Sequence, residues 1–585
     1  MQHDQKTKYL CAMQKIIRLL TIAIFIGYSL MAQTNYAQNY FALPVHIPLA
    51  LVGNFGELRP NHFHAGLDIR TNGEEGLPIY AVADGYVSRI KISAYGYGKA
   101  IYITHPNGYT SLYGHLRGYT SEITTAVKAI QSNRETFEVD TLLPPDYLLV
   151  TKGQQVAWSG NTGSSGGPHL HFEIRNTKTE MPINPYCFGY KVADNVAPRI
   201  EELAIFPVGK AATVNGKQSM KKIKPKYNNN HYSVIDTVYV SGEIGFGIKC
   251  WDSETGSTNH NGVYSIELQA SGRKLYAHQL ETFSFQNARY INSHIAYAEK
   301  EKNNDLIEKC FLSKNDKLEI YRGVEHAGII HFSDDSIHWL KYIVKDYDGN
   351  TAEVFLKVRS SSKHTLVVNE KNSVQPFFDC FTENKFENDE VKIILPPAVL
   401  YDDINFEYSK TLDLKAPYAA LHHIHTSTTA LQSEYSLQLK AVKLPDSLQS
   451  KACIISISSK GKVEYEGGSY ADHYVSTKTK HFGNFTIGID ATPPHLALAT
   501  KSKGQAVANF AKARIIGISA TDNLSGIKTY RATIDGKWVL CEYEPRKNLL
   551  YYIFDDALKS GEHSFRIEVA DDKQNTSVLS FKFKR

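Results

Sequence analysis

The chain has 585 residues, which is too many for one hydrophobic core and indicates roughly three to five domains. It carries 65 Lys and Arg against 60 Asp and Glu, so its net charge of +5 is mild for this length. A mild positive charge is compatible with an anionic polymer as a partner. Because no stretch forms a basic block, we expect no nucleic acid among the partners.

The N-terminus has the pattern of a secretory signal peptide. Lys15 and Arg18 precede an apolar run over residues 19–32, and polar residues follow that run. The run is short for a membrane span, so we interpret residues 1–32 as a signal peptide, for which Met13 is a second candidate start. An uncleaved anchor is the alternative. No later segment is apolar for long enough to span a bilayer, which predicts an exported protein of the periplasm or cell envelope.

Residues 33–195 contain short β-type runs separated by turn signals. Two β-hairpins are predicted, because in each of them a turn that contains glycine joins two such runs. The hairpins span residues 79–90, with the turn at Asp84 and Gly85, and residues 100–113, with the turn at residues 106–108.

Residues 117–151 interrupt this β pattern, which resumes after residue 151. Within them, residues 124–132 are compatible with a short helix, and Pro144-Pro145 marks a loop. We interpret the segment as an insertion into a β domain that extends over residues 33–195.

Beyond residue 195 the chain is predicted to be all-β, and two parts of it match each other. In both, an Asp-x-x-x-Gly element is followed by a strand that contains a histidine, a D-x-x-x-N-T turn and a last strand. The matching residues lie at one constant spacing: His338 and His563, Val344 and Val569, Asp346 and Asp571, Asn350 and Asn575, Thr351 and Thr576. This ending resembles that of bacterial immunoglobulin-like sandwiches.

We therefore predict immunoglobulin-like β-sandwiches over residues 196–360 and 491–585, each of which begins after a proline-marked joint. The region between them, residues 361–490, has short strands and turns but no repeat, so its fold type stays unassigned. Asp346 and Asp571 occupy positions at which the side chain of a turn residue bonds the backbone of the turn. We therefore interpret both as residues that stabilise turns and take no part in chemistry.

The six cysteines that follow the signal peptide are widely scattered and include no C-x-x-C pair: Cys187, Cys250, Cys310, Cys380, Cys453 and Cys541. Their spacing identifies neither a metal site nor a disulfide pair. An exported location permits disulfides, and buried free thiols are the alternative that we favour.

Histidine and carboxylate side chains recur in three short motifs of the first region: His64 and Asp68 in H-x-x-x-D, His115 in Y-G-H-L, and His169 and His171 in H-x-H. The apolar residues alternate over residues 170–174, which predicts a strand, and strand residues at i and i+2 project from the same face. Histidine and carboxylate are the ligands that a catalytic zinc uses when it keeps one position open for water. The pattern therefore predicts a metal site.

These motifs occur in a fixed order with glycine-rich loops at residues 153–156 and 159–163 between them, and together they resemble the lysostaphin/LytM-type zinc metallopeptidases that cleave peptidoglycan peptides. The resemblance covers about residues 50–190. The leader at residues 53–61 and the sandwich tail are similar to longer members from Bacteroidetes-type bacteria. The implied fold class is mainly β: a LytM-type antiparallel β-sheet metallopeptidase domain followed by immunoglobulin-like β-sandwich domains.

The resemblance also implies roles for the motif residues. One zinc ion per chain is expected to be held by His64, Asp68 and His171. His115 and His169 are expected to lie beside the metal without binding it, where they can stabilise an oxyanion and move a proton to the leaving amine. The sequence holds no H-E-x-x-H helix motif, so we do not expect a thermolysin-like enzyme.

We therefore expect an exported zinc metalloendopeptidase that cuts stem or cross-link peptides of peptidoglycan with a zinc-activated water. A catalytically silent LytM-type activator or scaffold for other wall hydrolases is the main alternative, and a protease that acts on other bacteria's walls or on host proteins is another. The sandwiches suggest envelope proteins as partners. Because the insertion at residues 117–151 falls between His115 and His169, we expect it to form a flap at the mouth of the substrate groove.

Overall fold

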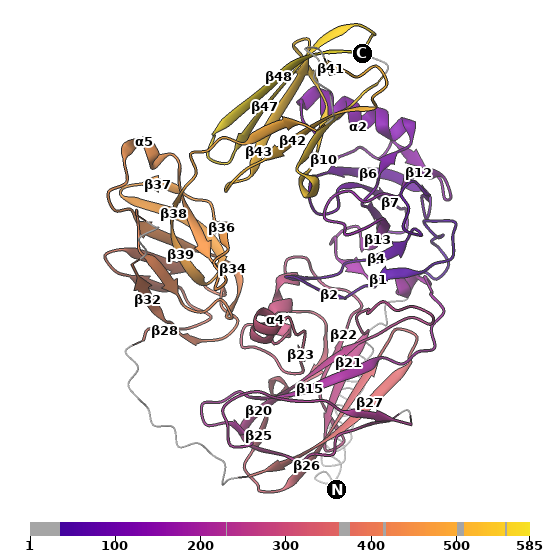
Figure 1. Cartoon of the computed structure of the whole chain (residues 1–585). Helices are drawn as coiled ribbons and strands as arrows, with labels where there is room; N and C mark the ends of the chain where they lie inside the picture. Colours follow the sequence, from indigo (N-terminus) through magenta and orange to yellow (C-terminus); the bar gives the residue numbers. More distant parts are fainter. Residues whose placement is uncertain (1–35, 230, 362–374, 413–416, 500–507, 556–557) are drawn as a thin grey trace, which may run out of the picture.

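The computed structural model describes the chain over residues 36–229, 231–361, 375–412, 417–499, 508–555 and 558–585. The proposed signal peptide lies outside the described residues. The described residues are mainly β, as predicted, and pack around four large hydrophobic cores in sequence order. Within this part of the chain no helix is both long and apolar enough to cross a membrane. Figure 1 shows the four bodies arranged as a ring that closes where the C-terminal strands lie beside α2.

A nine-stranded sheet with the order β1-β4-β13-β8-β7-β6-β10 supports the first core, in the N-terminal region of residues 36–195. Its strands are β1 (Leu51–Gly53), β4 (Leu67–Arg70), β6 (Gly85–Ile92), β7 (Lys99–Thr104), β8 (Tyr109–Gly114), β10 (Val139–Leu142), β11 (Leu149–Val150), β13 (His169–Asn176) and β14 (Pro182–Ile183). The predicted alternation in β13 is confirmed, since Leu170, Phe172 and Ile174 all belong to the core. The intervening side chains therefore project from the opposite face of the sheet.

The second predicted hairpin is confirmed, but the first is wrong. Strands β7 and β8 pair antiparallel around the turn at residues 106–108. The two strands of the first predicted hairpin belong to different sheets. Strand β6 pairs with β7 in the large sheet. Strand β5 (Pro78–Tyr80) pairs with β12 (Gln155–Trp158), and β12 also pairs with β9 (Gly118–Tyr119), in a separate three-stranded sheet. Between β5 and β6, Ala81, Val82 and Ala83 are all buried. The chain crosses here from one sheet to the other. Residues 81–83 are apolar because this connection is buried, and they do not form a strand of a hairpin.

The insertion at residues 117–151 is built into the N-terminal region. The expected helix is present as α2 (Ser121–Arg134), longer than predicted, and Ile123, Ala126 and Val127 on it pack against the first core. Strand β10 then extends the sheet beside β6, three strands away from β8. Among the described residues, no hydrogen bond or ion pair joins residues 121–150 to the predicted metal ligands. The expectation of a flap over the site is therefore wrong, because the segment packs at the far sheet edge.

The first sandwich, residues 196–360, is organised by the long strand β20, which takes part in two sheets. The chain turns from one sheet to the other at Gly242, where φ is +76° and a Cβ atom would lie 3.0 Å from the Ala212 Cα. Its elements are β15 (Arg199–Pro207), β16 (Thr213–Val214), β17 (Lys221–Ile223), β18 (Lys226–Asn228), β19 (His231–Ser233), β20 (Val238–Trp251), β21 (Ser265–Ala270), β22 (Arg273–Gln279), α3 (Ile291–His294), α4 (Tyr297–Asn303), β23 (Glu308–Lys309), β24 (Tyr321–Val324), β25 (Ile330–Phe332), β26 (Ile337–Lys345) and β27 (Thr351–Ser360).

Part of this sandwich packs against the N-terminal region instead of its own core. Leu280, Phe283, Ile291 and Ile320 all belong to the first core. The Phe283 ring centroid lies 5.2 Å from that of Phe55 and 5.5 Å from that of Phe63, which follow β1 and end β3. Strand β3 (His62–Phe63) pairs with β2 (Leu58–Arg59) just before the H-x-x-x-D motif. The segment at residues 280–320 therefore supports the chain that leads into the site.

The middle sandwich, residues 375–490, packs two five-stranded sheets over the third core. Its elements are β28 (Phe377–Phe378), β29 (Asn384–Glu387), β30 (Val391–Leu395), β31 (Ile404–Asn405), β32 (Tyr408–Thr411), β33 (Leu421–Ile424), β34 (Ala430–Lys440), α5 (Asp446–Gln449), β35 (Ala452–Ile457), β36 (Val463–Tyr465), β37 (Ser469–Ala471), β38 (Tyr474–His481) and β39 (Gly483–Ile489). This is the region to which no fold type was assigned from the sequence.

The C-terminal sandwich, residues 491–585, packs a four-stranded sheet on a five-stranded one. Its strands are β40 (His495–Leu498), β41 (Ala508–Asn509), β42 (Ile515–Thr521), β43 (Ile527–Ile534), β44 (Lys537–Val539), β45 (Cys541–Glu544), β46 (Leu549–Ile553), β47 (Glu562–Asp571) and β48 (Thr576–Lys584). The predicted repeat is confirmed, because β26 pairs with β27 as β47 pairs with β48 around the matching turns. The six cysteines of the described residues are unpaired, as favoured above.

Candidate metal centre

The structure brings His64, Asp68 and His171 together on the outer face of the large sheet. Asp68 lies on β4 directly opposite His171 on β13, and His64 precedes β4. His64 Nε2 lies 3.0 Å from Asp68 Oδ1 and 3.1 Å from His171 Nδ1, and the last two atoms are 2.8 Å apart. Three atoms about 3 Å apart can all lie about 2.0–2.2 Å from one ion, the range of zinc ligands.

The tautomers of the two histidines make this cluster electron-rich. The Nδ1–H of His64 donates to the Asn54 carbonyl oxygen at 2.6 Å. The Nε2–H of His171 donates to Glu173 Oε1 at 2.8 Å. When both rings are neutral, each uses its N–H outwards, so that His64 Nε2 and His171 Nδ1 present lone pairs to each other and to the Asp68 carboxylate. Such lone pairs repel unless a cation lies between them, and two imidazole nitrogens with one carboxylate oxygen fit zinc.

The surrounding charges favour a positive charge at the same point. Burial opposes ionisation of Glu173, but the Arg175 guanidinium and the hydrogen bond from His171 outweigh it and lower the pKa of Glu173 to about 2. Burial likewise opposes a charge on His171, yet its hydrogen bonds to Asp68 and Glu173 raise its pKa to about 9. Arg175 Nε donates to Glu173 Oε2 at 2.7 Å. A cation at this point is therefore stabilised by two buried carboxylates.

His115 and His169 lie beside the three predicted ligands, with ring centroids 4.8 Å apart. The Nδ1–H of His115 donates to the Thr162 carbonyl oxygen at 2.8 Å, and that of His169 donates to the Gly167 carbonyl oxygen at 2.8 Å. His169 Nε2 lies 3.4 Å from Asp68 Oδ1. Burial and the nearby histidines lower the pKa of His115 to about 3, so its ring is neutral near pH 7. The neutral His115 ring keeps Nε2 as a proton acceptor.

Several residues that build the site were not singled out from the sequence. Asn54 and Thr162 act through their carbonyl oxygens, which no side-chain motif reveals. Arg59 Nη2 donates to Asp68 Oδ2 at 3.1 Å, the oxygen that faces away from the histidines. Glu173 could have been found, because it lies two residues after His171 on one strand and therefore projects from the same face.

Part of the N-terminal region is similar to a known protein family. Residues 62–132 match the family model described as Peptidase family M23, a stretch that includes His64, Asp68 and His115. The chain contains an M23-family peptidase domain. From here on, residues 36–195 are called the M23 domain. Residues 375–490, the middle sandwich, match the family model described as Zu5-like domain.

Several relatives are similar to about a fifth of this chain. An uncharacterized metalloprotease of Haemophilus influenzae is 35% identical over 129 residues, which is 22% of this chain and 21% of that protein. The peptidoglycan DD-endopeptidase ShyB of Vibrio cholerae is 32% identical over 127 residues, 20% of this chain and 24% of that protein. The murein hydrolase activator NlpD of Escherichia coli is 34% identical over 110 residues, 19% of this chain and 22% of that protein. The match thus spans between a fifth and a quarter of each of these relatives.

Among solved structures, the catalytic domain of the antimicrobial peptidase lysostaphin from Staphylococcus simulans is similar to this chain. The two are 26% identical, the similarity covers 23% of this chain and 87% of that one, and the TM-score is 0.18.

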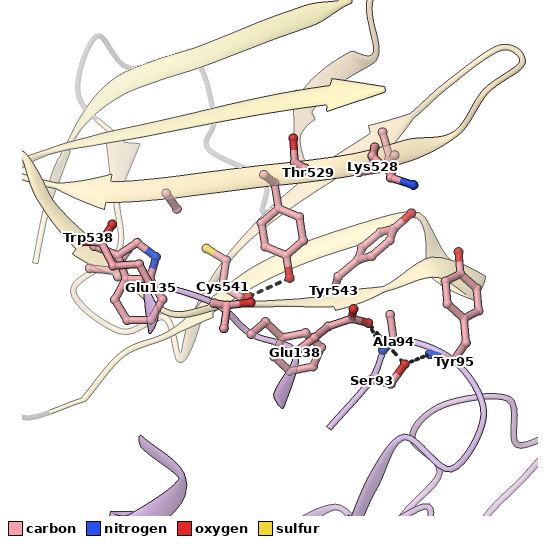
Figure 2. Close-up of a pocket in the computed structure, with 16 residues that line it drawn as sticks. Ser93, Ala94, Tyr95, Glu135, Glu138, Lys528, Thr529, Trp538, Cys541 and Tyr543 are labelled. Atoms are coloured by element: carbon pink, nitrogen blue, oxygen red, sulfur yellow. Dashed lines mark hydrogen bonds between the residues drawn. The ribbon is translucent and has the colours of Figure 1, made fainter. Parts of the chain in front are cut away.

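The C-terminal sandwich contacts the M23 domain near the candidate centre. Lys99 and Glu542 form a largely buried ion pair of 2.8 Å, and Arg546 donates to the Asn161 carbonyl oxygen. Asn161 precedes Thr162, which binds His115. Figure 2 shows a neighbouring cavity of about 370 Å³ between residues 93–95 and 135–138 of the M23 domain and strands β43–β45. The sandwich therefore supports the loop behind His115, and this cavity is separate from the metal centre.

We expect Glu173→Gln to weaken zinc binding about 10- to 100-fold, the usual cost of losing a partner that orients a metal ligand. The amide keeps the size of the side chain but removes the negative charge opposite His171 and Arg175. Competition with a zinc chelator of known affinity measures the change. Glu138→Gln, which alters a carboxylate bonded to the Ala94 N–H outside the centre, is the control. Equal zinc affinity in both variants would contradict the orienting role.

Proposed function

We propose that this chain is an exported zinc metalloendopeptidase that hydrolyses peptide bonds in peptidoglycan. The observation that carries the proposal is the convergence of two imidazole lone pairs and one carboxylate oxygen within about 3 Å, with both outer N–H groups already bonded. His64, Asp68 and His171 would hold the zinc. Glu173 and the Asn54 carbonyl would keep the two rings in the tautomers that binding needs.

When bound, zinc would supply a Lewis acid that activates water and polarises the peptide carbonyl. His115 and His169 would carry out the proton transfers, because both rings lie beside the three ligands and each Nδ1–H is bonded to a backbone carbonyl, which leaves Nε2 for the reaction. A ring that takes a proton from the attacking water becomes an N–H donor for the developing oxyanion. The same ring can then give that proton to the leaving amine.

The substrate assignment is supported by the relatives, which include a protein named peptidoglycan DD-endopeptidase. An apolar N-terminal segment with the pattern of a signal peptide supports export to the periplasm or cell envelope. In a Gram-negative host, we propose the cross-link between D-alanine and diaminopimelate as the target. The three sandwiches would then position the M23 domain through contacts with envelope proteins.

The competing function is a catalytically silent activator of other wall hydrolases, and it is favoured by the similarity to proteins named murein hydrolase activator. A silent domain has no need for a complete set of ligands with their orienting partners. Both the metal-binding set and the two flanking histidines are complete here, so we favour the enzyme.

Purified full-length protein incubated with peptidoglycan tests the proposal. We expect mass spectrometry to detect new muropeptides whose amide bonds are cut, and we expect a zinc chelator to abolish their release and added zinc to restore it. Release of no muropeptide by zinc-loaded protein would support the activator instead. Cleavage of protein substrates without cleavage of peptidoglycan would assign the activity to a different substrate class.

A further inference from the structure

The first and C-terminal sandwiches carry the same three aspartates at the joint where each begins. One comes from the joint itself, one opens the Asp-x-x-x-Gly element and one opens the D-x-x-x-N-T turn. In the first sandwich these are Asp194, Asp252 and Asp346, and in the C-terminal sandwich they are Asp490, Asp522 and Asp571. Within each set, one carboxylate oxygen from every member lies within 4.8 Å of the others.

The hydrogen bonds around the two joints correspond to each other. The N–H of Thr255 donates to Asp194 Oδ1 at 3.1 Å, and the N–H of Ser525 donates to Asp490 Oδ2 at 3.0 Å. Thr255 and Ser525 each lie three residues after the aspartate of the Asp-x-x-x-Gly element.

The asparagine of each terminal turn also binds its joint in the same way. Asn350 Nδ2 donates to the Asp194 carbonyl oxygen at 3.5 Å, and Asn575 Nδ2 donates to the Asp490 carbonyl oxygen at 3.0 Å. The same arrangement of three aspartates and one asparagine therefore occurs in two sandwiches, which lie on opposite sides of the ring (Figure 1).

The turn interpretation of Asp346 accounts for only part of the first cluster. Asp346 Oδ1 accepts from the Gly349 and Asn350 N–H groups, as a turn residue does. Asp252, however, is 5% exposed and its Oδ1 has no hydrogen-bond partner among the described residues. Asn261 is 2% exposed and its Oδ1 likewise lacks a partner there. A buried oxygen without a partner destabilises the folded chain, and more so when it is charged.

The oxygen atoms that lack partners border a small space. Asp194, Asp252, Asn261 and Asp346 line a cavity of about 20 Å³, against about 10–15 Å³ needed for one water-sized occupant. Burial, followed by the charges of Asp346 and Asp194, raises the pKa of Asp252 to about 8. At the second joint, Asp522 Oδ1 and Ser525 Oγ are buried without partners among the described residues. Both joints therefore hold buried oxygen atoms that have no hydrogen-bond partner among the described residues.

We propose that each joint binds one calcium ion, held in the first by Asp194, Asp252, Asp346 and the amide oxygen of Asn261. In the second joint, Asp490, Asp522 and Asp571 would hold the ion. All of these ligands are oxygen atoms from carboxylates and an amide, which suit calcium, whereas zinc sites in proteins usually include nitrogen or sulfur ligands as well. Calcium also tolerates irregular geometry better than magnesium does, and these joints offer ligands from three separate loops.

A calcium ion bound at the first joint would affect the M23 domain through the loop at residues 252–262, which is hydrogen-bonded to that domain. Asn54 Nδ2 donates to the Gly262 carbonyl oxygen at 2.7 Å, and the Gly262 N–H donates back to Asn54 Oδ1 at 2.9 Å. Asn259 Nδ2 donates to the Leu51 carbonyl oxygen at 2.7 Å. Since the Asn54 carbonyl also orients His64, calcium would stiffen the segment behind the metal centre. This consequence depends on the proposed function, whereas calcium binding itself does not.

Calorimetric titration of calcium chloride into the full-length protein, dialysed into calcium-free buffer, tests the proposal. We expect saturable binding of two ions per chain with dissociation constants of about 1 mM or tighter, and a higher melting midpoint in millimolar calcium. Binding is read without any measurement of hydrolysis, so the result is independent of the proposed activity. Zinc content is measured on the same samples.

Single substitutions separate the two joints. We expect Asp252→Asn and Asp522→Asn each to reduce the stoichiometry from two to one, and the double variant to bind none. Asparagine keeps the size of aspartate and one acceptor oxygen, so the melting midpoint of each variant without calcium should match that of the unsubstituted protein, which excludes misfolding as the cause. Asp389→Asn, at an exposed aspartate, should still bind two. Absence of saturable binding, or two ions bound by the double variant, would overturn the proposal. If Asp252→Asn loses one ion and Asp522→Asn loses none, the proposal is wrong for the second joint.

Discussion

Replacement of Asp68 or His171 by alanine is expected to remove most of the zinc and, with it, peptide hydrolysis. Each variant deletes one of three converging ligand atoms and leaves a buried gap beside His64. Loss of a partner that only orients a ligand already costs about 10- to 100-fold in metal affinity, so loss of a ligand should exceed about 100-fold. Metal analysis of the purified variants and muropeptide release from peptidoglycan are measured together.

The control for these variants is His62→Ala. The His62 side chain is exposed and, among the described residues, bonds the Pro60 carbonyl oxygen alone, although it lies two residues from His64. We expect this variant to keep its zinc and its turnover. Full zinc content in both Asp68→Ala and His171→Ala would show that the ligand assignment is wrong.

The second large effect is expected from His115→Ala and His169→Ala. Each should lower turnover about 100- to 1,000-fold, because the variant loses a side chain that accepts a proton and then donates it to the oxyanion. Zinc content should stay unchanged, because neither ring belongs to the converging set of three. Zinc content and muropeptide release are again measured together. The prediction is that muropeptide release falls while zinc content does not.

His105→Ala provides a control for the loss of a buried histidine. The ring of His105 bonds the Asp84 carbonyl oxygen and Ser111 within the N-terminal core, away from the metal centre. It should lower stability while the folded protein keeps its turnover. Near-normal muropeptide release from both His115→Ala and His169→Ala would remove their catalytic role. Zinc loss from His169→Ala alone would mean that His169, and not His171, is a ligand.

The sequence was informative wherever side-chain pattern and strand geometry coincide. The alternation in β13 placed His169 and His171 on one face, and the pairing of β13 with β4 then set His171 opposite Asp68. The matching D-x-x-x-N-T turns likewise predicted two hairpins, because a turn is a local structure that its own residues determine.

Prediction failed where distant packing decides the structure. Residues 81–83 were assigned to a hairpin, but they cross between two sheets and are buried on all sides. The insertion was expected to cover the site because it lies between His115 and His169 in sequence, yet α2 finds its apolar partners in the core at the far sheet edge. The Asn54 and Thr162 carbonyls orient ligands and flanking rings through the backbone, which carries no residue-specific signal.

The packing of Phe283 against Phe55 and Phe63 has a consequence for protein engineering. A recombinant fragment cut at residue 195, where the sequence marks a boundary, would expose two aromatic rings that flank the H-x-x-x-D motif. Each such ring buries on the order of 150–250 Å² in a folded protein. The M23 domain therefore packs as one unit with the segment over residues 280–320. Fragments of the domain for crystallisation or for chimeras should retain the chain through residue 320.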